Sequence, residues 1–149
     1  MSSCLHESLS HPIDSTSQTR RNFSERLLKP FGLTSEQFHL LKNVTLGHGL
    51  SQSALCELVG KNPANISRIL DRLESKGLVK RCENPNDRRT SLVFQTASGH
   101  ILVSEVSSMF TAISMEIEQD ISPQDRAVFK YVLKRITTNL DRLLKRHGD

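Results

Sequence analysis

The sequence predicts a mainly α-helical protein with one small β-hairpin. Apolar residues recur at helical spacing along most of the chain, several of these segments begin at a good capping residue, and the spacing changes to every second residue only within residues 78–94. The chain has 149 residues, which is enough for one domain with its own core and too few for two ordinary ones. We therefore expect a flexible tail over residues 1–14 and a single domain over residues 15–149.

Two helices are expected before residue 50. The first covers residues 15–30, and Gly32 follows its end. The second begins at Thr34-Ser-Glu-Gln37, which has the form of a capping box, because the Thr hydroxyl and the Gln side chain can each satisfy a free backbone N–H. Apolar residues then follow at helical spacing until Gly47.

A short third helix is expected next. Ser51 is suited to cap it, and Gly60 is suited to end it. Its apolar residues Leu55, Leu58 and Val59 are expected to point inward.

The fourth helix has the clearest start in the chain. Asn62 is a good cap, and Pro63 stands at the first helical position, where its missing N–H costs nothing. Four apolar residues follow at the spacing of one helix face: Ile66, Ile69, Leu70 and Leu73. The opposite face carries amide, hydroxyl and guanidinium groups, those of Asn65, Ser67, Arg68 and Arg72. One face should be buried, and the other should be basic and able to form hydrogen bonds.

A β-hairpin is expected directly after this helix. Residues 78–82 and 90–94 alternate like strands, and residues 84–87 have the composition of a turn. Two adjacent arginines, Arg88 and Arg89, would then lie near the hairpin tip.

Two longer helices are expected to complete the chain. Thr96 can cap one over residues 97–118, and Ser122 followed by Pro123 can begin another that continues to about residue 146. Their apolar stripes are wide for a chain of this size, so we infer that a second copy of the chain buries part of them. The alternative is packing of the two helices against each other.

The charge distribution supports a nucleic-acid partner. Between Lys61 and Arg89 there are eight basic and four acidic residues, whereas Thr90 to Asp125 has five acidic residues and no Lys or Arg. A basic stretch is typical of proteins that bind phosphate backbones, although a solvated helix face can give the same count. Two short helices joined by a turn and followed by a hairpin form a winged helix-turn-helix. Its second helix can fill the major groove, and arginine at the hairpin tip suits a narrow minor groove.

The run over residues 33–99 resembles the MarR family of bacterial winged-helix transcription regulators. The stretch DRLESKGLV, Asp71 to Val79, is characteristic of the family, as is a hairpin pattern matched here by Asp87, Arg89, Thr96 and Gly99. With the flanking helices, the resemblance covers about residues 15–146. The sequence departs from the family at Gln95, where the family usually has Leu. We expect this difference to affect packing at the base of the hairpin.

The resemblance implies a function and a set of contacts. It implies a homodimer with dimerisation helices at residues 15–30 and 97–146 and a DNA-binding lobe at residues 33–96. The dimer would bind a pseudo-palindromic double-stranded DNA operator as a ligand-responsive or stress-responsive repressor with a small-molecule effector. By the same resemblance, Arg89 contacts the minor groove and Asp87 orients it. The remaining implied DNA contacts are Pro63, Ala64, Asn65, Ser67, Arg68, Arg72 and Arg88.

The same sequence contains features that bear on other functions. Cys82 lies beside Lys80 and Arg81, which would favour a thiolate, so a redox-responsive regulator is one alternative; an inert thiol is the simpler interpretation. A winged-helix adapter that binds protein is another alternative, but its recognition face should be neutral or apolar. The sequence shows no phosphate loop or nucleophile motif, so we expect no enzyme, no catalytic residue and no cofactor.

The histidines and cysteines lack metal-ligand spacing, so we also expect no metal site. The apolar runs are too short for a membrane span, and a secretory signal is not recognisable. A cytoplasmic location is therefore expected.

Overall fold

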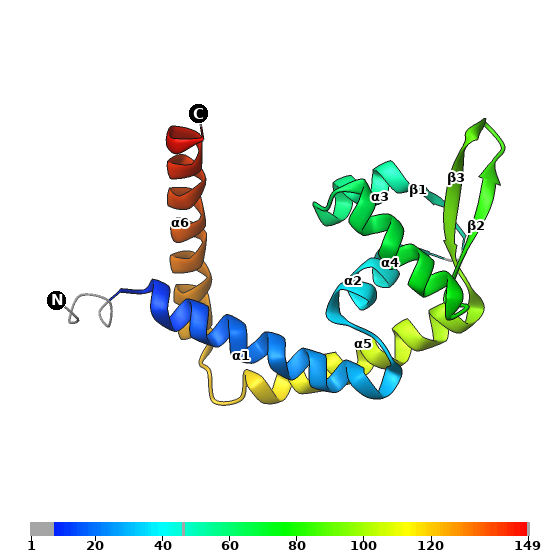
Figure 1. Cartoon of the computed structure of the whole chain (residues 1–149). Coiled ribbons are helices and arrows are strands. Elements are labelled where there is room, and N and C mark those ends of the chain that lie inside the picture. The colour runs from blue at the N-terminus through cyan, green and yellow to red at the C-terminus, as the bar shows by residue number, and fades with distance from the viewer. Residues whose placement is uncertain (1–7, 46, 149) are drawn as a thin grey trace. The chain divides into compact units, whose positions relative to one another are not determined.

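The computed structural model describes residues 8–45 and 47–148 (Figure 1). Its contacts divide the chain into two compact units, Met1–Ser108 and Met109–Asp149, and the division falls within one long helix. The mainly helical fold class with a small antiparallel sheet is confirmed.

The first unit begins with helix α1, Ser10–Leu28, followed by the 3₁₀ turn η1, Lys29–Phe31. Helix α1 starts five residues before the predicted position, inside the segment expected to be a tail. Pro12 is compatible with this start because it lies in the first turn, where backbone N–H groups have no partner within the helix. The rest of the predicted tail, residues 1–7, lies outside the described residues.

Helix α2, Ser35–Asn43, begins as predicted. The Thr34 hydroxyl accepts a 3.2 Å hydrogen bond from the Gln37 backbone N–H, and the Gln37 side chain accepts one from the Thr34 N–H. Gln37 itself is buried. The capping box is thus both the start of α2 and part of the core.

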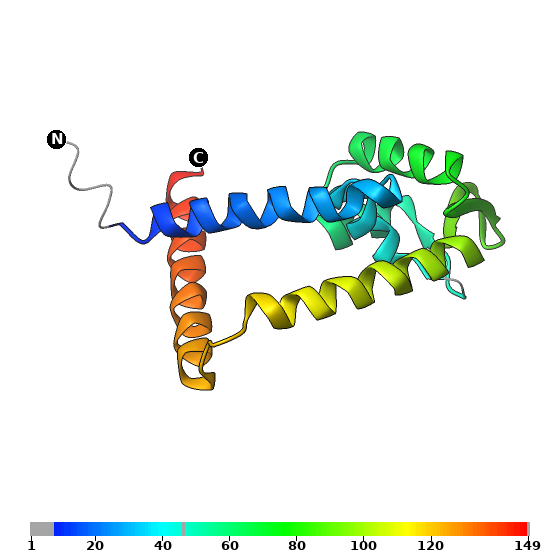
Figure 2. The same ribbon diagram turned by 90° about the horizontal axis from the view of Figure 1, so that it is seen from below.

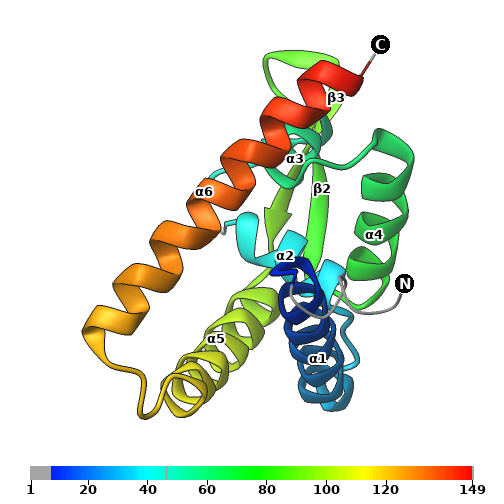
Figure 3. The ribbon, with the colours of Figure 1, turned by 90° about the vertical axis from the view of Figure 1, so that its left-hand side faces the viewer.

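Helices α3, Gln52–Val59, and α4, Pro63–Ser75, form the helix-turn-helix, and α4 lies at the surface of its unit (Figures 2 and 3). Their predicted caps are confirmed, since Ser51 and Asn62 each accept a hydrogen bond from a first-turn backbone N–H. The prediction that Leu58 points inward is wrong, because 57% of its surface is exposed. The buried side of α3 is centred on Leu55, and Leu58 falls outside it.

The sheet has three antiparallel strands in the order β1-β3-β2. Strands β2, Val79–Asn84, and β3, Asp87–Gln95, form the hairpin and are longer than predicted. Strand β1, Leu50–Ser51, was not predicted and pairs with β3. Gly49 precedes it, and a Cβ there would lie 2.5 Å from Phe94 Cζ, so a larger residue would separate these strands.

The core of the first unit lies between the helices and the base of the sheet. The four apolar residues predicted for the inner face of α4 are all buried. They share the core with residues from α2, α3 and the strands, among them Leu40, Leu41, Leu55, Val79 and Val93. This packing fixes which side of α4 faces out.

Helix α5, Ala97–Ile117, starts at the predicted cap in the first unit. The Thr96 hydroxyl donates to the Gly77 carbonyl oxygen at 2.7 Å and accepts from the Gly99 N–H at 3.0 Å. Within the second unit, helix α6, Pro123–His147, is capped by Ser122 as predicted, and Arg126 forms a 2.6 Å ion pair with Glu118. Helix α6 lies wholly within the described residues, and none of its residues is buried.

Across residues 8–45 and 47–148, no helix combines the length and the apolar character that crossing a bilayer requires.

Candidate nucleic-acid interface

The outward face of α4 carries all the residues predicted for that helix. Pro63, Ala64, Arg68 and Arg72 are exposed, and Asn65 and Ser67 are half-buried. Because the other side of the helix is fixed in the core, these side chains point away from the interior. The helix therefore presents amide, hydroxyl and guanidinium groups on one side, as the sequence predicted.

The start of α4 is held in place by two side chains. Asn62 Oδ1 accepts a 2.9 Å hydrogen bond from the Asn65 N–H, and Gln52 Nε2 donates a 3.0 Å hydrogen bond to the Pro63 carbonyl oxygen. The second contact ties α3 to the first turn of α4. Helix-turn-helix proteins contact base edges with the N-terminal part of the second helix, so this is the part that must be held precisely.

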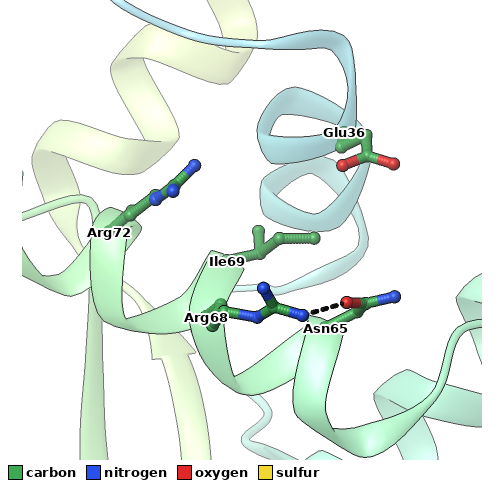
Figure 4. Close-up of a pocket in the computed structure, with 5 residues that line it drawn as sticks. All are labelled: Glu36, Asn65, Arg68, Ile69 and Arg72. Atoms are coloured by element: carbon green, nitrogen blue, oxygen red, sulfur yellow. Dashed lines mark hydrogen bonds between the residues drawn. The ribbon is translucent and has the colours of Figure 1, made fainter.

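A pocket of about 160 Å³ lies beside this face, between α4 and the first turn of α2 (Figure 4). Its lining residues are Glu36, Asn65, Arg68, Ile69 and Arg72. Arg68 Nη2 donates a 2.7 Å hydrogen bond to Asn65 Oδ1. Glu36 forms a 2.5 Å ion pair with Lys61 instead of with either arginine. Glu36 therefore does not pair with the guanidinium group of Arg68 or of Arg72.

The hairpin tip is ordered by short-range hydrogen bonds. Asp87 Oδ1 accepts a 3.0 Å hydrogen bond from the Arg89 backbone N–H, and Thr90 Oγ1 donates to the Asp87 carbonyl oxygen at 3.1 Å. Arg88 and Arg89 are exposed, and among the residues that the structure describes neither side chain takes part in an ion pair. The contact of Asp87 with Arg89 in the structure is thus to the backbone of Arg89, and the role expected for Asp87 in orienting Arg89 stays a prediction.

Arg81 is a residue of this surface that sequence reasoning did not assign. From β2 it donates to Asp71 Oδ1 at 2.7 Å and to Glu74 Oε2 at 2.5 Å, both on α4. Its backbone N–H also donates to Glu74, at 3.1 Å. Partial burial alone would lower the pKa of Arg81, but these hydrogen bonds and charges together raise it above its ordinary value. Arg81 stays cationic and joins the hairpin to α4.

The same contacts bear on Arg72. Arg72 has two acidic neighbours on α4, Asp71 and Glu74, and an ion pair with one of them would be the alternative to DNA contact. Both carboxylates bind Arg81, and none of the ion pairs within the described ranges includes Arg72. Two acidic residues three positions apart on a helix, followed by an arginine in the next strand, are the signal that could have revealed this arrangement.

The cysteines and acidic residues of the described part of the chain bear on the redox and metal predictions. Cys82 is exposed on β2 opposite Leu92, and Cys56 is half-buried; Cys4 lies outside the described residues. The Arg81 charge expected to favour a Cys82 thiolate is shared by two carboxylates. Within residues 8–45 and 47–148, no group of three His, Cys, Asp or Glu side chains is placed to hold a metal ion.

Comparison with known proteins gives relatives that match most of the chain. The multiple antibiotic resistance protein MarR of Escherichia coli is 26% identical over 125 residues, which cover 83% of this chain and 87% of that protein. A crystal structure of a mutant E. coli MarR complexed with operator DNA has a TM-score of 0.73 and 26% identity, covering 86% of this chain and 92% of that one. A MepR–DNA complex from S. aureus has a TM-score of 0.78 at 24% identity, covering 89% and 98%, and supports the fold alone.

A helix-turn-helix followed by a hairpin, with a polar and basic outer helix face, defines the winged-helix class of DNA-binding folds. A family model described as MarR family matches residues 31–90, which contain these elements. Over its winged helix-turn-helix, the chain is similar to transcriptional regulators of the MarR family. Members of this family are transcription regulators and not enzymes.

Proposed function

We propose that the protein binds a pseudo-palindromic DNA operator as a homodimer and represses transcription until a small-molecule or stress signal releases it. The observation that carries the proposal is that two elements of one unit present exposed arginines that form no ion pair among the described residues. These are Arg68 and Arg72 on α4 and Arg88 and Arg89 at the hairpin tip. A helix can occupy the major groove while the hairpin contacts the neighbouring minor groove. Repression and the effector are supported by the family resemblance. Operator binding also favours a cytoplasmic location.

Asp87, Pro63, Ala64, Asn65 and Ser67 complete the proposed contact set. Asp87 would act by shaping the hairpin tip, through its hydrogen bond to the backbone of Arg89. The others stand on the first two turns of α4, where side chains reach base edges in this class of fold. A protein-binding adapter is disfavoured, since its recognition face would not need exposed guanidinium groups.

We assign DNA binding and dimerisation to the same segments that the sequence predicted. Residues 33–96 would form the DNA-binding lobe, and the helices over residues 15–30 and 97–146 would form the dimer. Support comes from large apolar side chains that are exposed in one copy of the chain: Phe23, Ile101, Met115, Ile117, Val128, Phe129, Tyr131, Leu140, Leu143 and Leu144. Apolar exposure on this scale is typical of an interface.

The proposal is tested in two steps: selection of the duplex DNA that the protein binds, and titration of that DNA with the wild-type protein and its variants. A pool of random duplexes should yield an inverted repeat with half-sites about 10 bp apart, as two-fold symmetry requires. Arg89→Ala should weaken binding about tenfold or more and reduce the magnitude of the salt slope by about one. Arg20→Ala removes an equal charge from an exposed position on α1 and should leave affinity near the wild-type value.

Two results would reject this model. One is a selection without a symmetric motif. The other is an Arg89→Ala variant that stays folded, by circular dichroism, and binds with unchanged affinity and salt slope.

A redox response through Cys82 stays the alternative that the sequence left open, beside the simpler interpretation of an inert thiol. Mild peroxide treatment followed by mass spectrometry checks it, since an unmodified Cys82 thiol would end that alternative.

A further inference from the structure

The hydrogen bond between Asn65 and Arg68 joins two side chains on the outer face of α4 (Figure 4). The residues are three positions apart, so they lie on the same side of the helix. Asn65 is half-buried, and its backbone is fixed by the Asn62 cap, whereas Arg68 is exposed. The arginine thus reaches back to a partner that is anchored.

The chemistry of the two groups fixes how the Asn65 amide is turned. A guanidinium has N–H donors and no acceptor, so Asn65 must offer its oxygen to Arg68. The amide nitrogen of Asn65, with its two N–H groups, is then left for other partners. Arg68 also keeps most of its five N–H donors. The pair as a whole offers hydrogen-bond donors and a positive charge.

Glu36 does not disturb this arrangement. Among the described residues that line the pocket, Glu36 is the acidic one. Its carboxylate forms a 2.5 Å ion pair with Lys61. Arg68 therefore has Asn65 as its partner on α4, and the donor groups of the pair are not consumed by a neighbouring acid.

We infer that Asn65 and Arg68 act together as a donor unit that selects guanine over adenine at one position of each operator half-site. This inference rests on the proposed function, because α4 must enter the major groove. Guanine presents two acceptors there, N7 and O6, whereas adenine presents one acceptor, N7, and the N6 amino donor. An asparagine reads adenine by offering both its oxygen and its nitrogen. Here the oxygen is bound by a cation, which would face the adenine amino group.

The inference differs from independent action of the two residues. If Arg68 acted alone on guanine or on a phosphate, the oxygen of Asn65 would be released, and Asn65 could read adenine at a separate position. The structure favours joint action because a 2.7 Å hydrogen bond already joins the two side chains.

Base substitution in the selected operator tests the inference. Each half-site should contain a guanine whose replacement by adenine, or by 7-deazaguanine, weakens wild-type binding about tenfold or more. Asn65→Ala and Arg68→Ala should each abolish most of the preference at that same position, and the double variant should lose little more. Arg72→Ala should instead weaken binding to all sequences by a similar factor, as expected for a phosphate contact.

The outcomes separate the two proposals. Absence of any sequence-selective binding by the wild-type protein rejects the proposed function and the inference with it. Selective binding in which Asn65→Ala alters preference at an adenine, or at a position different from that altered by Arg68→Ala, rejects the inference alone. Thermal unfolding of each variant, followed by circular dichroism, confirms that the proteins compared are folded.

Discussion

Gln95 Nε2 donates a 3.0 Å hydrogen bond to the carbonyl oxygen of Leu41, and both residues are buried. Leu41 lies in the last turn of α2, and its carbonyl oxygen also accepts a 3.3 Å hydrogen bond from the Val44 backbone N–H. Gln95 Oε1 lies 3.2 Å from His100 Nδ1, and the Gln95 backbone N–H donates to the Thr45 carbonyl oxygen at 3.0 Å. The residue that departs from the family pattern thus connects α2, β3 and α5.

Gln95→Leu, which restores the residue usual in the family, should lower the free energy of unfolding by about 0.5–1.5 kcal/mol. The buried Leu41 carbonyl would lose a hydrogen bond that the new side chain cannot replace. Urea denaturation followed by circular dichroism measures the change. Gln18→Leu, at an exposed position on α1, is the control and should change stability little. Equal or greater stability of Gln95→Leu would show that packing outweighs this bond.

Gly99→Ala should also destabilise the protein, by about 1–3 kcal/mol. Helix propensity alone predicts the opposite sign, since Ala in a helix is favoured over Gly by about 0.5–1 kcal/mol. At this site a Cβ would lie 2.1 Å from the Leu78 carbonyl oxygen and 3.1 Å from Gln95 Cγ. Thermal or urea unfolding distinguishes the two signs, with Ser98→Ala at the neighbouring exposed position as the control. A stabilised Gly99→Ala would contradict the close packing of α5 against the turn between α4 and β2.

Local signals explain why much of the fold could be predicted. The Thr34–Gln37 capping box and the Asn62-Pro63 and Ser122-Pro123 starts depend on residues within one helical turn, so the sequence alone displays them. The inner face of α4 was equally readable because its four apolar residues repeat at one period. Once the inner face of α4 was assigned to the core, the polar residues on the opposite side of the helix had to face outward.

Contacts between distant residues explain what could not be predicted. Strand β1 has only two residues and exists because β3 lies beside it, about 40 residues further along the chain. Leu58 matched a helical pattern, but α3 has eight residues, and the direction of its buried side depends on where α4 and the sheet lie. The partners of Arg81 and Gln95 likewise come from other elements.

Arg81→Ala should weaken DNA binding severalfold although Arg81 is not a proposed DNA contact. Its two ion pairs hold β2 against α4, so their loss should loosen the hairpin relative to the helix, although the backbone N–H at position 81 can still donate to Glu74. Arg81→Lys should rescue only part of the effect, because a lysine cannot bridge two carboxylates with a planar fork.

A double-mutant cycle with Glu74→Ala measures this coupling. Unfolding free energies of the two single variants and the double variant should show an interaction of about 0.5–3 kcal/mol. Arg20→Ala, again on α1, should add independently to Glu74→Ala. Fully additive effects of Arg81→Ala and Glu74→Ala on both stability and DNA affinity would remove Arg81 from this role.

Leu140→Glu with Leu144→Glu should convert the proposed dimer into monomers and reduce operator affinity. The two leucines are one helical turn apart on α6, and 54% and 69% of their surfaces are exposed in a single chain. A second copy that covers them could not accommodate two unpaired carboxylates without a large desolvation cost. Light scattering coupled to size exclusion gives the mass directly. Asn139→Glu, an adjacent exposed position, adds the same type of charge and should leave the mass at that of a dimer.

A Leu140→Glu/Leu144→Glu protein that keeps the wild-type dimer mass would show that this side of α6 lies outside the interface. In that case the exposed leucines would need another partner, and the apolar residues of α1 and α5 would be the next to test.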